Sequence, residues 1–246
     1  MVRIDVRISL MHSSETISQF STIDAILQGI YDGPATFGEV RRYGDFGIGT
    51  VNHLDGEMLA LDGIFYQITG DGVVHVIKDK EKTSFATVAF FNPRHHSVEA
   101  HVSSLRSLQG RMDRHLGSKN FFWSIRIDGI FSSMRVRSIS RQHPPYRPLA
   151  EVARSEAVFE FRNLPGTLLG FRSPPYIKGI NVPGYHFHFI SDDRTKGGHV
   201  LGCSLFKGKA SWSCHRTFQM MLPNDPAFRH ADFSEHDAEA LRKAEQ

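Results

Sequence analysis

The strongest constraint on the fold is an alternating segment at residues 184–191, which reads GYHFHFIS. Successive side chains of a β-strand point to opposite faces, so residues two apart lie side by side, about 6–7 Å from each other. As a strand, this segment places His186 and His188 on one face and its aromatic residues on the other, where they can anchor it in a core. A polar stretch that ends in a glycine pair at 197–198 follows, and it is typical of a hairpin turn. We therefore expect a β-hairpin whose second strand begins at His199.

The three histidines of this hairpin form a candidate metal site, because the return strand brings His199 back toward His186 and His188. Three neutral imidazoles with an open fourth position are typical of catalytic zinc, whereas four protein ligands are typical of structural zinc. Cys203 is the sequence-local candidate for a fourth ligand, but on a strand that continues from His199 it lies roughly 13 Å further along. The alternative is that the histidines are ordinary, partly buried strand residues, in a chain that has 14 histidines.

Composition limits the class of protein. The chain has 246 residues, of which 40% are hydrophobic and 22% charged, as in a soluble globular protein with one large or two small domains. No apolar run approaches the roughly 20 residues that span a bilayer, and Arg3, Asp5 and Arg7 interrupt the N-terminal segment. We therefore expect a cytoplasmic protein without a membrane partner. Two cysteines, Cys203 and Cys214, do not make a disulfide framework.

Charge gives a weaker indication of partners. The formal net charge is +3, and the basic residues are dispersed along the chain. A nucleic-acid groove typically shows a long basic run with interleaved aromatic residues, and such a run is missing from the sequence. We expect no nucleic-acid partner, and the arginines are compatible with a small anionic substrate.

The order of the patterns predicts an α+β fold. A mixed α/β sheet domain is expected over residues 1–130, with the first ~16 residues loose, because strand-like runs separated by Asp-Gly turns follow short helical patterns. An antiparallel β-rich domain is expected over residues 131–246, ending in a C-terminal helix.

Three helices are expected in the first half of the chain. Apolar residues at positions 23, 26, 27 and 30 predict a helix that Ser21 or Thr22 caps. Thr36 and Glu39 have the spacing of a capping box at the start of a second, short helix. A third helix is expected to begin at Ser97, with apolar residues at positions 98, 102, 105 and 112.

A carboxylate and an arginine are candidates for the chemistry. Glu57 has the strand parity of Leu59 and Leu61, and burial on an apolar face raises a carboxyl pKa, which suits a proton donor at neutral pH. The alternative is that Glu57, first in its strand, points to water.

Arg135 and Arg137 share one face of a predicted strand, an arrangement that is usual at a solvated edge. Near a metal, either guanidinium would bind a carboxylate. Periodicity does not choose between them.

Longer motifs resemble a known family. They are GDFGIGTVNHLDGEMLALDGIFYQI at 44–68, RIDGIF at 126–131 and GINVPGYHFHFISDDRTKGGHVLGC at 179–203. In their order and spacing they resemble the α-acetolactate decarboxylase family, over nearly the whole chain from Ser21 onward. The resemblance implies a homodimer, a Zn²⁺ cofactor held by three histidines between two domains, and no organic cofactor. It also implies the conversion of 2-acetolactate to acetoin and carbon dioxide through a metal-stabilised enediolate.

The resemblance also implies roles for individual residues. The metal ligands match the three histidines of the hairpin, and the acidic residue of the LDGE motif is here Glu57. The remaining site residues that it implies are an arginine, a threonine of the GIGT motif near the pocket, and a second glutamate near the C-terminus: Arg137, Thr50 and Glu245.

Two other functions compete with this one. A cupin-like metal-dependent oxygenase or isomerase also uses a His-x-His strand, and it needs an acidic ligand about four residues after the second histidine, where this chain has Asp192. A non-enzymatic β-rich module with a structural zinc needs a fourth protein ligand, for which Cys203 is the nearby candidate.

Overall fold

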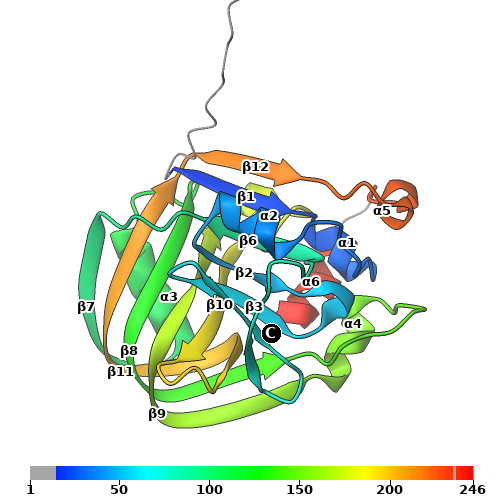
Figure 1. Ribbon diagram of the computed structural model, residues 1–246. Helices are drawn as coiled ribbons and strands as arrows, with labels where there is room; N and C mark the ends of the chain where they lie inside the picture. The colour runs from blue at the N-terminus through cyan, green and yellow to red at the C-terminus, as the bar shows by residue number, and fades with distance from the viewer. Residues whose placement is uncertain (1–14, 235–236, 246) are drawn as a thin grey trace, which may run out of the picture.

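The described chain is built around two β-sheets (Figure 1). A computed structural model describes residues 15–234 and 237–245. The seven strands of the first sheet are β1 (Thr16–Phe20), β2 (Phe46–Thr50), β3 (Glu57–Leu61), β4 (Ile64–Ile68), β5 (Val74–Val76), β6 (Phe85–Ala89) and β12 (Thr217–Met221). Their order is β12-β1-β6-β2-β3-β4-β5. Because β1 and β12 run parallel and the other neighbours antiparallel, this sheet is mixed.

The second sheet is antiparallel and strongly curved (Figure 1). Its five strands are β7 (His95–Val102), β8 (Phe122–Ser138), β9 (Ala157–Ser173), β10 (Gly184–Ser191) and β11 (Gly197–His215). Their order is β10-β9-β8-β11-β7, and β10 also pairs with β11. This extra pairing closes β10, β9, β8 and β11 into a ring.

The helices are short (Figure 1). The α-helices are α1 (Ile23–Leu27), α2 (Phe37–Val40), α3 (Leu105–His115), α4 (Leu149–Val152), α5 (Pro226–His230) and α6 (Ala238–Glu245). The 3₁₀ turns are η1 (Arg41–Tyr43), η2 (Asn52–Leu54), η3 (Ala153–Ser155) and η4 (Pro175–Ile177). Within the described ranges, no helix combines the length and the hydrophobicity that a transmembrane helix requires.

The expected α+β fold, a mixed sheet together with an antiparallel β-sheet, is confirmed. The expected boundary at residue 130 lies inside β8. β7 precedes that boundary but belongs to the five-stranded sheet, and β12 follows it but belongs to the seven-stranded sheet. The two sheets are therefore interleaved along the chain, and a division into domains at residue 130 stays a prediction.

The two expected N-terminal helices form where their caps indicate. The Ala25 amide donates to Thr22 Oγ1 over 3.2 Å, which makes Thr22 the cap of α1. α1 ends at Leu27, so it is shorter than the apolar spacing predicted. At α2 the capping box is complete, because Thr36 Oγ1 accepts from the Glu39 amide and Glu39 Oε2 accepts from the Thr36 amide.

The helix expected from Ser97 is wrong. Residues 95–102 form β7, which pairs antiparallel with β11, and the helix begins at Leu105 with Ser104 as its cap. The pairing with β11 satisfies the backbone groups of this segment along a sheet edge. Non-local strand pairing therefore overrides the helical spacing of its apolar residues.

The two sheets share a hydrophobic core. Ile48 and Leu59 come from the seven-stranded sheet, and Leu169, Phe171 and Ile190 come from the five-stranded sheet; all are buried in one cluster. A second core fills the inside of the five-stranded sheet beneath α3 and contains Phe187 and Phe189, as the alternation of β10 predicts. The face of β10 that carries His186 and His188 is thereby turned away from that core.

Candidate metal centre and active site

The expected histidine hairpin is present, and it brings three imidazoles together. His188 on β10 lies opposite His199 on β11 in the antiparallel ladder, and His186 lies two residues before His188. The ring centroids are 5.3 Å apart for His186–His188, 5.0 Å for His186–His199 and 5.5 Å for His188–His199. One nitrogen from each ring lies within 4.8 Å of the others, and all three residues are buried. This cluster could hold a metal ion.

The tautomer of His188 is determined by the backbone of β3. His188 Nδ1 lies 2.8 Å from the Met58 carbonyl oxygen, which can only accept, so Nδ1 carries the proton and Nε2 carries the lone pair. Within the described residues, the buried Nε2 makes no hydrogen bond, and Glu57 Oε2 lies 3.4 Å from it. A metal-binding histidine typically donates its other ring nitrogen to such a carbonyl. The arrangement of His188 therefore fits a metal ligand.

Burial keeps two of the three imidazoles neutral. Desolvation, together with the nearby Arg137 charge, lowers the pKa of His186 to about 3. Burial also lowers the pKa of His188 well below its ordinary value, and the neighbouring His186 and Arg137 act in the same direction. Because only the neutral imidazole can bind a metal, these two residues are in a ligand-competent form at neutral pH.

Side chains from both sheets line a cavity of about 50 Å³ beside the histidines. Thr50 and Glu57 come from the seven-stranded sheet, where they face each other across the β2–β3 pair, and both are buried. Thr50 Oγ1 donates to the Gly56 carbonyl over 2.7 Å, so it holds the turn from which Glu57 projects. The remaining wall is largely apolar: Ile23, Ile26, Leu54, Phe85, Ile139 and Leu149.

Glu57 does not point to water. The residue is 8% exposed, lines the cavity and approaches His188, so of the two interpretations left open by its parity, the buried one holds.

Arg137 also lines the cavity, whereas Arg135 does not. Arg137 is buried and lies opposite His199 in the β8–β11 ladder. Arg135 is exposed and lies opposite Gly202, beyond a β-bulge at residues 200–202. The Arg137 Nη1 group donates to Glu156 Oε2 over 2.6 Å, which fixes one side of its guanidinium. This buried arginine is the one placed to meet an anionic group in the cavity.

The C-terminal helix α6 packs close to this region, but the side chain of Glu245 lies outside the part of the chain that the structure describes. Asp237 caps the helix, because its Oδ1 accepts from the Ala240 amide over 2.8 Å. Leu241 is buried in a cluster that also contains Leu149 and Leu54. The role of Glu245 stays a prediction.

The acidic and thiol ligands required by the competing functions are elsewhere. Asp192 is exposed in the hairpin turn and is not part of the histidine cluster. Cys203 is buried in the core inside the five-stranded sheet, and burial raises the pKa of its thiol to about 12. Among the described residues the cluster consists of the three histidines alone.

The sequence did not indicate two partners of the site. The Met58 carbonyl orients His188, and Glu156 pairs with Arg137. A main-chain carbonyl leaves no signal in the residue types, and Glu156 lies 19 positions from Arg137 in a segment without a motif.

One glycine beneath the site makes close strand packing possible. A Cβ atom at Gly170 on β9 would lie 2.0 Å from the His186 carbonyl oxygen and 3.0 Å from Phe187 Cα. Gly170→Ala must therefore push β10 away from β9, and we expect a loss of about 1–3 kcal/mol in the free energy of unfolding, measured by urea denaturation. At Gly202 on β11 an added Cβ meets nothing within 4 Å, so Gly202→Ala is the matched control. Equal midpoints for the two variants would contradict this explanation.

Three buried histidines that converge beside a carboxylate are typical of a metal-dependent enzyme. Comparison with known proteins specifies the class. The sequence model of the alpha-acetolactate decarboxylase family matches residues 17–235. The chain therefore belongs to the alpha-acetolactate decarboxylase family, a family of carboxy-lyases.

Individual relatives agree in sequence and in structure. The alpha-acetolactate decarboxylases of Methanosarcina mazei and Methylococcus capsulatus are each 43% identical to this chain over 96% of its length, covering 82% and 91% of those proteins. The crystal structure of alpha-acetolactate decarboxylase from Bacillus subtilis strain 168 superposes with a TM-score of 0.91 at 35% identity, covering 94% of this chain and 99% of that one.

Proposed function

We propose that this protein is a zinc-dependent decarboxylase that converts 2-acetolactate to acetoin and carbon dioxide. The observation that carries the proposal is the cluster of His186, His188 and His199, with Glu57 and Arg137 on the walls of the same cavity. Membership of the family supports the substrate, and the donor set supports the metal, because three imidazoles with room for a further ligand are typical of catalytic zinc.

The substrate determines what the site must do. Acetolactate is a β-keto acid with a hydroxyl group next to its ketone, and loss of carbon dioxide leaves an electron pair that is delocalised as an enediolate. A zinc ion held by the histidines would supply a fixed positive charge beside the oxygens on which negative charge develops.

Arg137 and the cavity walls would orient the reacting acid. The guanidinium of Arg137 is buried and held on one side by Glu156, so it presents a positioned cation to the substrate carboxylate. The apolar wall excludes water, which strengthens this ion pair and protects the enediolate from protonation by solvent.

Glu57 would complete the reaction by donating a proton to the carbon that has lost carbon dioxide. The carboxyl group comes from β3, on the opposite sheet from the three histidines, so it approaches the site from one direction. Delivery from one direction protonates one face of the enediolate, and this would determine the stereochemistry of acetoin. Thr50 would hold the turn that aims Glu57.

An activity assay tests the proposal directly. We expect the purified protein to release acetoin from racemic acetolactate, measured colorimetrically, without added thiamine diphosphate or NAD. A chelator should abolish the release, and stoichiometric zinc should restore it, because no other described group replaces the charge at the histidines. A protein that holds one zinc per chain and releases no acetoin would contradict the proposal.

A further inference from the structure

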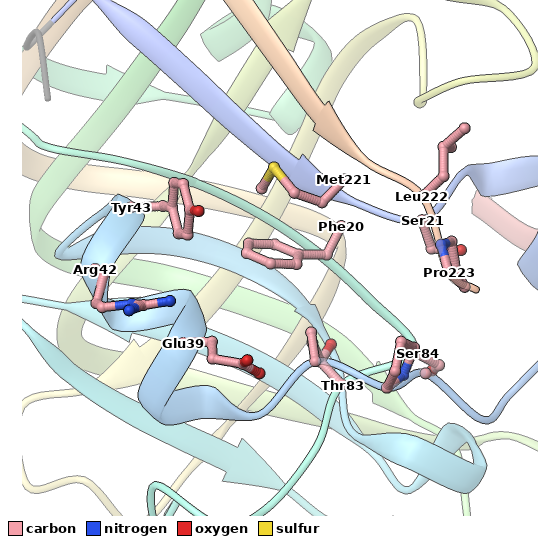
Figure 2. Close-up of a pocket in the computed structure, with 13 residues that line it drawn as sticks. Phe20, Ser21, Glu39, Arg42, Tyr43, Thr83, Ser84, Met221, Leu222 and Pro223 are labelled. Atoms are coloured by element: carbon pink, nitrogen blue, oxygen red, sulfur yellow. The ribbon is translucent and has the colours of Figure 1, made fainter. Parts of the chain in front are cut away.

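A second cavity, of about 240 Å³, is drawn in Figure 2; it shares no lining residue with the cavity beside the histidines. Its walls come from the end of β1, the segment before β6, the segment after β12, and α2 with η1. The apolar side chains of Phe20, Met221 and Leu222 line it, and none of the three histidines, Glu57 or Arg137 does.

Two buried hydroxyl groups stand in the wall of this cavity. Ser21 is 3% exposed and Ser84 is 2% exposed, and neither Oγ atom has a hydrogen-bond partner within the described residues. A buried hydroxyl without a partner loses its hydration and gains nothing in return. Both residues line the cavity, and a ligand oxygen that reached either hydroxyl would satisfy it.

The backbone at Ser21 is strained. Its φ is 67°, in the left-handed region that a serine rarely adopts. The structure around it holds this conformation, because the Ser21 amide donates to the Met221 carbonyl over 2.9 Å and Gln19 Nε2 donates to the Ser21 carbonyl over 2.8 Å. Strain of this kind is concentrated at functional sites, and here it positions Ser21 beside the cavity.

The opposite end of the cavity carries a guanidinium group, that of Arg42. Arg42 is exposed, and its charge helps to lower the pKa of Glu39, whose carboxylate lines the same end of the cavity. The nearby Glu39 carboxylate is occupied by the Thr36 amide at 2.8 Å and the Thr36 hydroxyl at 3.0 Å. In Figure 2, Arg42 and the two serines lie at opposite ends, with Phe20 between them. The cavity therefore has an end with the Arg42 guanidinium beside Glu39, an apolar middle and an end with two hydroxyl groups.

We propose that this cavity is a second ligand site, which binds a short aliphatic oxocarboxylate. The carboxylate of the ligand pairs with Arg42, its methylene chain packs against Phe20 and Met221, and its carbonyl oxygen accepts hydrogen bonds from Ser21 and Ser84. The site is preformed, because Gly33 packs so closely against this wall that a Cβ there would lie 1.9 Å from the Thr83 carbonyl oxygen.

Three related probes separate the parts of this interaction. They are 5-oxohexanoate, hexanoate (which lacks the carbonyl) and 5-oxohexanamide (which lacks the charge), each titrated calorimetrically into the metal-loaded protein. We expect 5-oxohexanoate to bind about fivefold more tightly than hexanoate and about tenfold more tightly than the amide. Binding is read directly, so the result does not depend on turnover.

Two variants assign the binding to the cavity. Ser84→Ala should reduce the preference for 5-oxohexanoate over hexanoate, because only Ser21 then remains as a donor, and Arg42→Gln should remove the preference over the amide. Ser84→Ala deletes an unsatisfied hydroxyl, so the unliganded variant should keep the melting temperature of the wild type, which shows that it folds. Arg94→Gln, which removes an exposed charge outside the cavity, is the control and should bind all three probes as the wild type does.

Several outcomes would overturn the proposal. One is the absence of binding at millimolar 5-oxohexanoate, as expected if a second copy of the chain covers the cavity. Another is binding that neither Ser84→Ala nor Arg42→Gln alters, which would place the probe at the histidine cluster instead. Equal weakening by Arg42→Gln and Arg94→Gln would show a general effect of net charge.

Discussion

Replacement of His188 by alanine is expected to remove the bound metal and reduce turnover to background. The variant loses one of the three imidazoles of the cluster. The lost imidazole is the one whose tautomer the Met58 carbonyl determines. His186→Ala and His199→Ala should have the same two effects, since each ring lies within 4.8 Å of the others. Zinc content per chain, measured by atomic emission, and acetoin release should fall together.

His143→Ala is the matched control, because His143 is exposed and does not belong to the cluster. It should retain full metal content and rate. A variant in which all three cluster histidines are alanine, but which still binds one zinc tightly per chain, would show that the metal site lies elsewhere.

Replacement of Glu57 by glutamine should lower the rate by roughly 10²–10⁴-fold, while folding and zinc content survive. Glutamine keeps the shape and the hydrogen bonding of the buried side chain but has no proton to donate at neutral pH. The measurements are acetoin release under saturating substrate, zinc content, and the enantiomeric composition of the acetoin.

Glu160→Gln provides the comparison for Glu57→Gln, because Glu160 is an exposed carboxylate on β9. It should leave the rate unchanged. A Glu57→Gln enzyme with the wild-type rate and stereoselectivity would show that the carboxyl group at 57 is structural. The same exchange at Glu245 then becomes decisive, and a comparable loss there would place the C-terminal helix over the substrate.

The local features of this protein could be predicted from its sequence. The alternation of β10 placed His186 and His188 on one face, and the glycine pair returned the chain to His199, as the β10–β11 pairing confirms. The capping box at Thr36 was equally readable. These features depend on residues a few positions apart, whose geometry follows from the period of a strand or the first turn of a helix.

The tertiary structure decided which of the remaining candidates belong to the site. Arg135 and Arg137 have the same strand parity, but only Arg137 lies opposite His199 and is buried. Glu57 could have faced water by its position, yet the meeting of β3 with β10 buries it beside His188.

The same non-local pairing explains both the failed helix and the orientation of the central ligand. β7 replaced the expected start of a helix at Ser97 because β11 offered a partner edge, and the Met58 carbonyl determined the tautomer of His188 from 130 residues away. The sequence by itself therefore determined the hairpin and the residue types of the site. Burial and hydrogen bonding between distant segments, which no local period encodes, decided how those residues meet.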